Sequence, residues 1–500
     1  MGAKQGGPSL YDAISGKYGI DDLQRERTYI PIDVMKELVT TESIYRELCR
    51  NSKHQVWGKG SRRQLAERVI KSHAQRVFLV LVLLDQSLDT ERLLNSGLTD
   101  DDLPLVKSGD AFRSERDGGK RFSLPPKWSS QTVDQFLDHQ WRLLAPVFGM
   151  SGKHRAFHPR QPMPFQKVDE SHKKGSSSFV YYVQIRPAHQ HFSGTGPHSH
   201  EIVLKEFPSR NQQDFETERA NLASIRRLGD NKHITQYLET YSQGDRSCIL
   251  FPFAKGGDLE DFWKCQNFRP RDRHLALWCL EQMLGLAQGL QVLHVFVGDD
   301  ANCRHGDLKP GNILHFTGGD DNNNGILKIA DFGISRIHTE TTFQRLGKAT
   351  VTKSTTPSYE APEESFRQAR SRKYDIWSMG CIFLEFALWL AESWDAVQAF
   401  DSARTPKRAR QGEPRPWARF YKGMGAAAKV HPEVFRILAR LRCSPRSAPG
   451  TALGDLLDMV ENHLLKVDVE ARFGAQDLSR RLGEIVSEAR ADAEYLFTSG

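Results

Sequence analysis

The chain has 500 residues, of which 39% are hydrophobic and 26% charged, and its 69 basic and 62 acidic residues give a net charge of +7. This length exceeds one usual hydrophobic core, so we expect two domains, and the composition is that of a soluble globular protein. The basic excess is too small to indicate nucleic-acid binding. The seven Cys are scattered and form no CxxC pair, which indicates a reducing compartment and neither a zinc site nor a disulfide framework.

The apolar segments and the N-terminus predict neither a membrane span nor a secretory signal. The most apolar run, Val77–Leu84, is too short to cross a bilayer and indicates a buried helix or strand. Met1-Gly2 begins like a myristoylation signal, but Gly6 stands where that signal needs Ser or Thr. The basic run Lys407–Arg410 fits either a nuclear signal or a solvated loop, and the loop is favoured. We therefore expect an intracellular protein, cytoplasmic rather than nuclear.

Residues 1–150 are predicted to form a mostly helical N-terminal region. Apolar residues recur there near the helical period, at Leu38, Ile44, Leu48, Leu65, Ile70, Val133, Phe136, Leu137, Trp141 and Leu144. The region contains no catalytic constellation, so its alternatives are regulation, docking of a partner, or simple packing against the rest of the chain. A segment rich in Gly, Ser, Pro and Lys, 151–177, is predicted as a linker.

A small β-rich lobe, 178–257, and a larger helical lobe, 258–490, are predicted next, before a tail, 491–500. The β-like runs of the small lobe are Phe179–Ile185, Glu201–Phe207, Ile234–Tyr241 and Ser247–Phe253, with a helix over Gln212–Leu228 between the second and the third. In the large lobe, Asn312–Phe316 and Ile326–Ala330 are predicted to pair as a hairpin among helices. This order predicts an α+β enzyme with its site between two lobes.

The strongest functional signal is the run His305-Gly306-Asp307-Leu308-Lys309-Pro310-Gly311-Asn312, followed by Asp331-Phe332-Gly333. Phosphoryl transfer requires a positioned hydroxyl group and cations that neutralise the transferred group. Asp307 is placed to accept or orient the hydroxyl proton, while Asn312 and Asp331 supply oxygen ligands that suit Mg²⁺. The predicted hairpin between the two motifs would bring both metal ligands to one end.

These two motifs in this order resemble the eukaryotic-type protein kinase superfamily, over about residues 170–490. The resemblance implies a two-lobed fold, ATP and Mg²⁺ as cofactors, and a protein substrate. Lys309 and Thr356 are typical of the Ser/Thr branch, which implies a Ser or Thr acceptor. The sequence of the first motif is similar to that of kinase-like proteins of filamentous fungi. We call residues 305–312 the catalytic loop and residues 331–363 the activation segment.

The resemblance also assigns a lysine and its ion-pair partner. Lys205, in the strand Glu201–Phe207, is similar to the lysine that binds the α- and β-phosphates of ATP. Glu218 lies on a helical face with apolar residues and is implied as its partner, since a charge there needs one. Glu216 is the competing choice, with a poorer helical phase. Lys309 is implied to steady the γ-phosphate.

The stretch from Ile249 to Leu259 resembles the segment that holds adenine. On this resemblance, Phe251 is the residue that narrows the back of the pocket, and Pro252 has no N–H to donate, which leaves Phe253 and Ala254 as donors. Asp258 is implied to contact ribose or a basic substrate residue. Leu314 would form the floor under the adenine ring, and Val203 would lie beside it.

The phosphate loop departs most from the family pattern. The family expects three glycines, whose backbone N–H groups approach the phosphates closely. Here Gly175 is retained, but Ser177 and Val180 occupy the other two positions. Tyr182 and Val203 are also larger than the residues expected there. Weakened nucleotide binding is the expectation, and a pseudokinase scaffold or binding module is the alternative function.

The end of the activation segment, Thr355–Glu363, resembles a platform for a protein substrate, which disfavours a third reading, a small-molecule kinase. Glu363 is implied to pair with Arg472, and Asp375 to bind the backbone of the catalytic loop. Gly306 replaces the arginine that usually receives an activating phosphate, so phosphorylation should control activity less here. The sequence thus predicts an ATP-dependent protein serine/threonine kinase.

Overall fold

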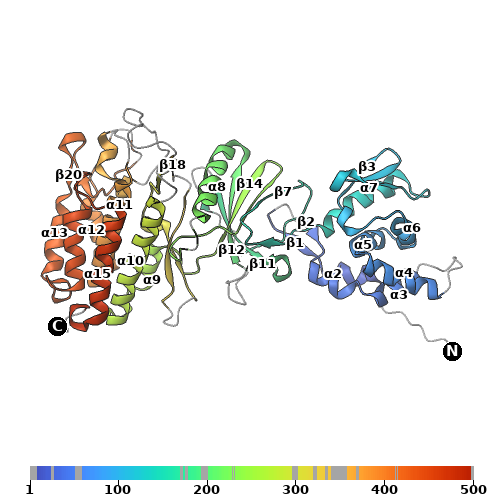
Figure 1. The fold of residues 1–500 in the computed structure, drawn as a ribbon, viewed down its shortest axis with the longest axis horizontal. Helices are drawn as coiled ribbons and strands as arrows, with labels where there is room; N and C mark the ends of the chain where they lie inside the picture. The colour runs from blue at the N-terminus through green and yellow to red at the C-terminus, as the bar shows by residue number, and fades with distance from the viewer. Residues whose placement is uncertain are drawn as a thin grey trace. The chain divides into compact units, whose positions relative to one another are not determined.

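A computed structural model describes residues 8–23, 27–50, 59–168, 173–174, 178–192, 201–227, 229, 231–295, 302–318, 324–332, 336–338, 357–366, 371–410, 413 and 415–496. The chain divides into two compact units; Figure 1 colours it by residue number from blue at the N-terminus to red at the C-terminus. Unit 1 comprises residues 1–210 and 238–251, and unit 2 comprises residues 211–237 and 252–500. The fold is α+β, as the sequence predicts.

The N-terminal part of unit 1 is a helical layer with a small sheet. Its elements are α1 (Leu10–Ser15), α2 (Ile32–Leu38), α3 (Thr41–Arg50), α4 (Lys59–Lys71), α5 (Gln75–Leu83), α6 (Thr90–Asn95), α7 (Ser130–His139), and the antiparallel strands β3 (Leu105–Ser108), β4 (Ala111–Ser114) and β5 (Arg121–Ser123). The apolar run predicted as a buried helix or strand is the helix α5, with Val77–Val82 buried. Asp100 caps this helix, because its carboxylate accepts the Arg76 and Val77 N–H groups at 3.0 Å.

A larger sheet follows in unit 1, with the order β7-β13-β14-β12-β10-β8, and β9 also pairs with β10. The strands are β7 (His154–Phe157), β8 (Phe165–Lys167), β9 (Lys173–Lys174), β10 (Phe179–Ile185), β12 (Glu201–Pro208), β13 (Glu239–Gln243) and β14 (Arg246–Pro252). Strand β10 is antiparallel to β12, β8 and β9, and β13 is antiparallel to β14, while β7 and β13 are parallel. Thus β7, β8 and β9 lie in the segment 151–177 predicted as a linker. The division of the chain into domains remains a prediction.

The strand predicted over Ile234–Tyr241 begins only at Glu239. Its first residues bond elsewhere: the Thr235 N–H donates to the Ile329 carbonyl at 2.8 Å, and Ile329 N–H donates to the His233 carbonyl at 2.8 Å. These backbone groups belong to unit 2. The apolar character of Ile234 therefore reflects packing in unit 2 and not a longer strand.

A short hairpin, β1 (Gly19–Asp21) and β2 (Arg27–Tyr29), covers the outer edge of β8. Asp21 Oδ2 accepts the Met163 N–H at 2.7 Å, and Asp22 Oδ2 accepts the Lys167 N–H at 3.0 Å. Between them, the Asp22 N–H donates to the Phe165 carbonyl at 3.1 Å. The pair Asp21-Asp22, which we call the edge cap, thus satisfies alternate backbone groups of a strand whose other side pairs with β10.

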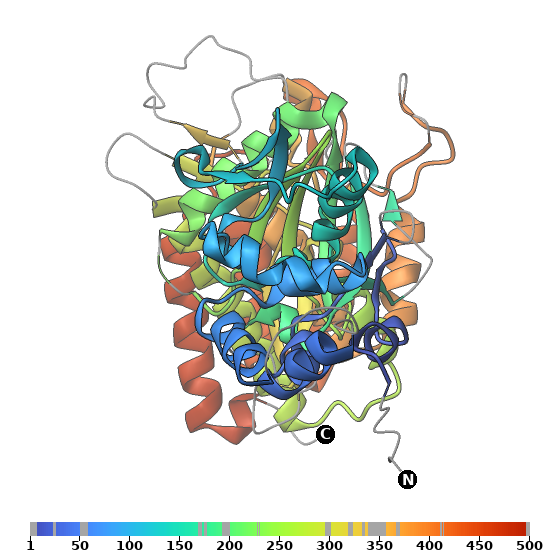
Figure 2. The ribbon, with the colours of Figure 1, turned by 90° about the vertical axis from the view of Figure 1, so that its right-hand side faces the viewer.

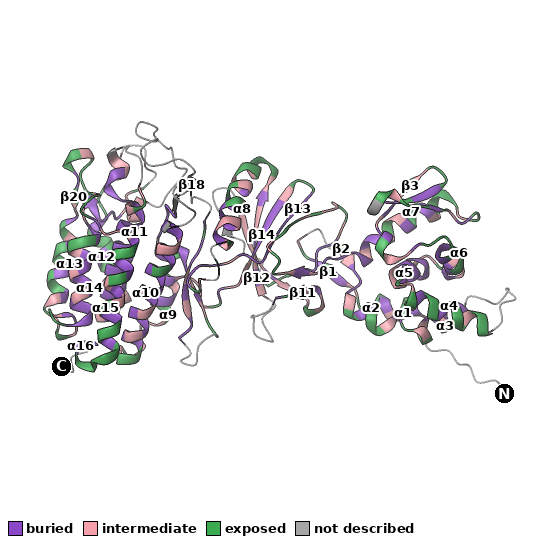
Figure 3. Ribbon diagram, viewed as in Figure 1, coloured by how far each residue is buried: buried purple, intermediate pink, exposed green. Residues whose placement is uncertain are grey.

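Unit 2 consists mainly of helices around a buried central helix, α11 (Lys373–Ala391). The others are α8 (Gln212–Arg226), α9 (Leu259–Cys265), α10 (Arg273–Val295), α12 (Trp394–Arg404), α13 (Pro432–Arg442), α14 (Ala452–Met459), α15 (Ala475–Ala491) and α16 (Ala493–Leu496). The red helix α15 runs alongside α10 (Figure 1, Figure 2). Every residue from Tyr374 to Leu390 is buried (Figure 3). By length and composition, α11 could cross a bilayer. However, 94% of its most apolar stretch is buried within the protein, as in the core helix of a soluble protein.

The helix predicted over Gln212–Leu228 is α8, and it groups with unit 2. A side chain on its buried face, Asn221, donates through Nδ2 to the Phe332 carbonyl at 3.0 Å. This bond ties α8 to the start of the activation segment.

Candidate active site

The backbone of the catalytic loop is hydrogen-bonded to the buried carboxylate of Asp375 on α11. Asp375 Oδ2 accepts the His305 N–H and Asp375 Oδ1 accepts the Gly306 N–H, each at 2.8 Å. Asp375 Oδ2 also lies 2.9 Å from Nε2 of His294 on α10. Burial alone would raise the pKa of Asp375, but the hydrogen bond and charge of His294, with His305 and Arg304, lower it below its usual value. The carboxylate stays charged and fixes the backbone before Asp307.

Two predicted catalytic residues, Asp307 and Lys309, meet the predicted metal ligand Asn312 on this loop. Lys309 Nζ lies 2.8 Å from Asp307 Oδ2, and Asn312 Nδ2 donates to the same oxygen at 3.1 Å and to the Asp307 carbonyl at 2.8 Å. Asp307 and Asn312 are buried, while Lys309 is partly exposed. These bonds hold the buried Asp307 carboxylate in one orientation.

The second motif reaches the same place through the predicted hairpin. Strands β16 (Ile313–Phe316) and β17 (Ile326–Ile329) pair antiparallel, with Ile313 opposite Ile329. The next residue, Ala330, donates its N–H to the Asn312 carbonyl at 2.9 Å, and its own carbonyl lies 2.9 Å from His305 Nε2. Asp331 follows directly. The hairpin therefore places Asp331 directly after Ala330, the residue bonded to Asn312.

Asp331 has the left-handed backbone conformation, with φ of +64°. Few residues other than Gly adopt this conformation without strain, though Asp and Asn do so most readily. The side chain is exposed, while Phe332 is buried and packs edge-on to the His305 ring, with centroids 5.3 Å apart. Because Phe332 is buried and Asp331 is exposed, the Asp331 side chain faces outward at the end of the hairpin.

The donor set fits a divalent cation such as Mg²⁺. Asn312 uses its Nδ2 for Asp307, which directs its Oδ1 to the opposite side as an oxygen ligand. Asp331 offers carboxylate oxygens from the adjoining hairpin. A hard cation prefers such oxygen ligands, with phosphate oxygens and water completing the shell. Asn312 and Asp331 would hold the metal.

Three of the predicted adenine-binding residues, Phe253, Ala254 and Asp258, lie on a turn that is bonded to β16. Gly256 donates its N–H to the His315 carbonyl at 3.0 Å, and His315 donates its N–H to the Gly257 carbonyl at 2.8 Å. Asp258 forms a backbone bridge with Leu314. A Cβ at Gly256 would lie 2.1 Å from His315 Nδ1, so this close approach requires glycine.

This turn brings Ala254, Asp258 and Leu314 together, with Phe253 next in the chain. Phe253 and Leu314 are half-buried and Ala254 is buried. Asp258 also has a structural role that sequence reasoning missed, since its Oδ1 accepts the Asp261 N–H at 3.0 Å and caps α9. The Asp258 carboxylate is thus already engaged at the start of a short helix. Its contact with ribose stays a prediction.

The remaining predicted residues are divided between the units. Val203, Lys205 and Phe251 lie in unit 1, and Lys205 Nζ stands 5.5 Å from the Phe207 ring centre on β12. Glu218 lies in unit 2 and is buried on α8. The pairing of Lys205 with Glu218 therefore stays a prediction.

The competing residue, Glu216, has another partner on its own helix, since Glu216 Oε2 accepts from Arg219 NH2 at 2.6 Å. This contact favours Glu218 as the residue that needs a partner elsewhere. In the phosphate loop, Gly175 and Ser177 lie outside the described residues. Val180 and Tyr182 are on β10, opposite Lys205 and Val203 of β12.

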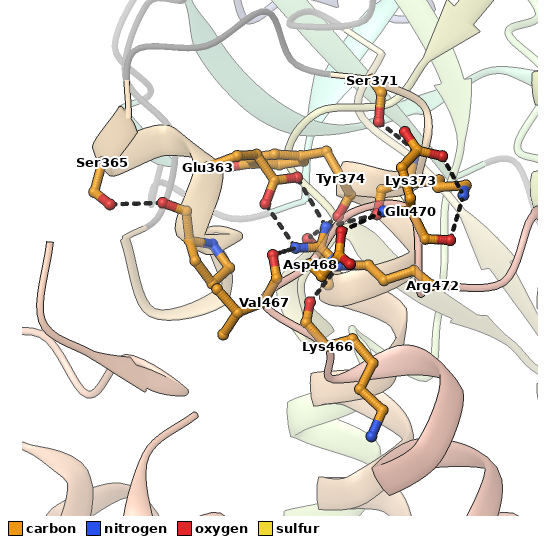
Figure 4. A network of polar contacts seen from close by, with 12 residues as sticks. Glu363, Ser365, Ser371, Lys373, Tyr374, Lys466, Val467, Asp468, Glu470 and Arg472 are labelled. Atoms are coloured by element: carbon orange, nitrogen blue, oxygen red, sulfur yellow. Dashed lines mark hydrogen bonds and ion pairs between the residues drawn. The ribbon is translucent and has the colours of Figure 1, made fainter. Parts of the chain in front are cut away.

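The end of the activation segment is fixed by a buried ion pair, as the resemblance implies (Figure 4). Arg472 donates through NH1 and NH2 to the two carboxylate oxygens of Glu363, at 2.8 and 2.7 Å. Its other bonds go to the backbone carbonyls of Lys373, Lys466 and Val467. A buried guanidinium with every contact to an acceptor is a stable arrangement, because neither charge is left unpaired.

A second buried contact at this end was missed by sequence reasoning. The Tyr359 hydroxyl donates to Glu385 Oε2 at 2.8 Å, and Arg404 NH2 lies 2.9 Å from Glu385 Oε1. Burial raises the pKa of Glu385 to about 7, although Arg404 and Tyr359 oppose this shift. A signal existed in the sequence, because Glu385 is an acid within the apolar helix α11 and such a residue needs a partner.

Comparisons with known proteins agree with this geometry. Residues 195–480 match the protein kinase domain. The chain is 30% identical over 224 residues to the serine/threonine-protein kinase Nek11 of Macaca fascicularis, covering 43% of this chain and 30% of that protein. It is 28% identical over 190 residues to the probable serine/threonine-protein kinase nek2 of Dictyostelium discoideum, covering 37% and 42%.

It is also 32% identical over 187 residues to the serine/threonine-protein kinase ATG1b of Arabidopsis thaliana, covering 37% of this chain and 23% of that protein. The chain thus spans less than half the length of these relatives. The domain match covers more than half of the chain, and it contains Lys205 as well as the whole catalytic loop and activation segment. The chain therefore belongs to the eukaryotic-type protein kinase superfamily, in its Ser/Thr branch.

Proposed function

We propose that this protein transfers the γ-phosphate of ATP to Ser or Thr residues of a protein substrate, with Mg²⁺ as the metal. The observation that carries the proposal is the convergence of Lys309 and Asn312 on the Asp307 carboxylate, within hydrogen-bonding distance. An arrangement kept only for packing would not require a lysine, an amide and a carboxylate on one anchored loop. The names of the relatives, all serine/threonine-protein kinases, support the same activity.

In this mechanism Asp307 orients the acceptor hydroxyl and accepts its proton as the bond to phosphorus forms. Lys309, held against Asp307, neutralises charge on the transferred group. Asn312 and Asp331 would hold Mg²⁺, which when bound screens the phosphate charges. Lys205, with Glu218 as its partner, binds the α- and β-phosphates in this proposal. Phe253 and Ala254 receive adenine over Leu314.

The direct test is the variant Asp307→Asn in the full chain. We expect phosphate transfer to a protein or peptide substrate to fall about 10²- to 10⁴-fold, because the residue acts in the transition state. Binding of Mg²⁺-ATP, measured by the thermal stabilisation that it causes, should remain. Asp395→Asn, an exposed carboxylate on α12, is the matched control and should retain activity. Full transfer by Asp307→Asn would refute the proposed role.

A pseudokinase scaffold is the second candidate, favoured by Ser177 and Val180 in the phosphate loop, where glycines are expected. Radiolabelled transfer together with Mg²⁺-ATP stabilisation separates the two functions. A protein that neither binds nor transfers would be a scaffold. The intact set of Lys205, Asp307 and Asn312 supports the enzyme.

We further propose that the protein works inside the cell, in the cytoplasm, and that its N-terminal helical region regulates the kinase or docks a partner. The scattered cysteines support a reducing compartment, and six of them form no disulfide in the part of the chain that the structure describes. A fluorescent fusion of the full chain tests the location. Accumulation in the nucleus would contradict it.

A further inference from the structure

The segment between α12 and α13 concentrates positive charge. Across the whole chain, basic and acidic residues nearly balance, at 69 and 62. Between residues 404 and 430 there is one acidic residue, Glu413, against eight basic ones, Arg404, Lys407, Arg408, Arg410, Arg415, Arg419, Lys422 and Lys429. Part of this run, Lys407–Arg410, is predicted from the sequence as a solvated loop in preference to a nuclear signal. Its position in unit 2 gives it a further role.

This segment packs directly on the end of the activation segment. The Phe420 ring lies 6.0 Å from that of Tyr359, and the Gly425 N–H donates to Ser365 Oγ at 3.1 Å. Arg419 NH2 lies 3.9 Å from Glu360, the residue before Ala361-Pro362-Glu363. The basic segment is therefore adjacent to the part of the chain that, on the proposed function, receives the protein substrate.

Two of the arginines serve the fold. Arg404 is fully buried against Glu385, and Arg419 pairs with Glu413 at 2.5 Å. Both are thus neutralised within unit 2. They fasten the segment to α11 and to the activation segment and leave the other cations for a different use.

Five of the six remaining cations lie between residues 407 and 422 and face outward, and the exposed Lys429 follows them. Lys407, Arg408, Arg415 and Lys422 are exposed and Arg410 is half-buried. Within the described ranges, none of the five has a carboxylate oxygen within the 4.0 Å of an ion pair. We call these five residues the basic platform. The nearest acid in sequence, Glu413, is already engaged by Arg419, so the platform keeps its charge.

Aromatic rings orient two members of the platform. The Arg415 guanidinium lies 4.2 Å from the Trp417 ring centre, and that of Arg410 lies 5.5 Å from the Tyr421 ring centre. A guanidinium held over a ring keeps its N–H edge for acceptors and loses less conformational freedom on binding. Such groups suit carboxylate and phosphate oxygens, which they bind in a two-pronged manner.

We propose that the basic platform docks an acidic segment of the protein substrate, next to the phosphorylated Ser or Thr. This inference rests on the proposed function and narrows it to substrates with Asp, Glu or phosphorylated residues near the acceptor. Nearby opposite charges raise the rate of encounter and favour one class of partner over others. The preference weakens as salt is added.

The test uses the full chain and a set of Ser peptides that differ only in the residues flanking the acceptor: Asp and Glu, phosphoserine, Ala and Gly, or Lys. We expect kcat/KM for the acidic peptides to exceed that for the neutral peptide about tenfold at low salt. In the triple variant K407Q/R408Q/R415Q this ratio should fall close to one. The variant R480Q/R490Q removes two exposed charges of α15 and should keep the ratio.

The peptide series also distinguishes sources of negative charge, because a larger gain with phosphoserine than with Asp assigns the platform to phosphorylated substrates. Equal kcat/KM for acidic and neutral peptides, or an unchanged ratio in the triple variant, would overturn the proposal. Tighter binding of an RNA oligonucleotide than of the acidic peptide would also overturn it. Fluorescence anisotropy of labelled acidic peptides measures docking separately from the proposed kinase activity. If these peptides bind through the platform but receive no phosphate, only the kinase activity is refuted.

Discussion

Asp21 in unit 1 and Asp375 in unit 2 are both fully buried, and each accepts two backbone N–H groups, yet their pKa values move in opposite directions. Burial raises the pKa of Asp21 to about 6, against the lowering effect of the Met163 and Leu23 N–H groups. The pKa of Asp375 lies below its usual value. The backbone bonds alone do not explain this difference.

The difference lies in the third partner. Asp375 has the His294 ring within hydrogen-bonding distance, and further positive charge from His305 and Arg304. Asp21 has arginines only as weaker influences, Arg246 and Arg27. A buried carboxylate therefore remains charged where a charged or proton-donating side chain joins the backbone donors. The catalytic loop has such an anchor, and the edge cap does not.

The largest effect is expected at the catalytic loop, for Asp375→Ala. Removal of the carboxylate leaves the His305 and Gly306 N–H groups and the His294 ring without their acceptor, which should cost about 3–5 kcal/mol of stability. Phosphate transfer should fall about 100-fold, because a shift of the loop moves Asp307. Urea unfolding and a transfer assay measure both. Wild-type activity in a folded Asp375→Ala protein would show that the anchor does not position the loop.

A smaller loss is expected for Asp21→Ala in the edge cap. Two backbone N–H groups lose their acceptor, but the cost of burying a charge disappears as well, so we expect about 1–3 kcal/mol. Hydrogen exchange at the Met163 and Lys167 N–H groups reports this edge of the sheet directly. The variant Asp22→Asn keeps an acceptor for Lys167 and is the control, with a change within about 0.5 kcal/mol. Equal losses in the Asp21→Ala and Asp375→Ala variants would remove the distinction between the two carboxylates.

The third effect, no larger than the loss expected for Asp21→Ala, is the pH dependence of stability. Because the pKa of Asp21 is raised to about 6 in the folded protein, the folded state binds more protons than the unfolded state between about pH 4 and 6. Its contribution to stability is therefore complete below about pH 4 and is lost as the pH rises through 6. Asp375, with a lowered pKa, contributes stability that is lost only as the solution becomes more acidic than its usual pKa.

We expect the unfolding free energy of the wild type, relative to Asp21→Asn, to decline by at most about 3 kcal/mol between pH 4 and pH 7. Urea unfolding of both proteins across this range measures the difference. A difference that does not change with pH would show that Asp21 is not the group that titrates.

The catalytic loop could be predicted because its chemistry is contiguous. Asp307, Lys309 and Asn312 lie within six positions, so the motif and the contact coincide. The hairpin of β16 and β17 was also predictable, because it joins nearby runs of apolar residues.

The edge cap and the strand β7 were not predictable. Asp21 binds the backbone of Met163, 142 positions away, and a backbone N–H gives no sequence signal. In the same way, β7 pairs in parallel with β13, about 86 positions later, through main-chain groups. The alternation of short runs such as His154–Phe157 is too brief to predict a strand. Long-range contacts to the main chain therefore escape pattern analysis even where the motif is strong.

The two covered sides of the unit 1 sheet matter for anyone who shortens this protein. The kinase domain match begins at residue 195, so a fragment cut there would lack β7, β8 and β10. Strands β12 and β13 would then become open borders, with rows of N–H and C=O groups ready to join other chains. Such a fragment should aggregate during expression, and its inactivity would report a broken sheet instead of the role of the removed region.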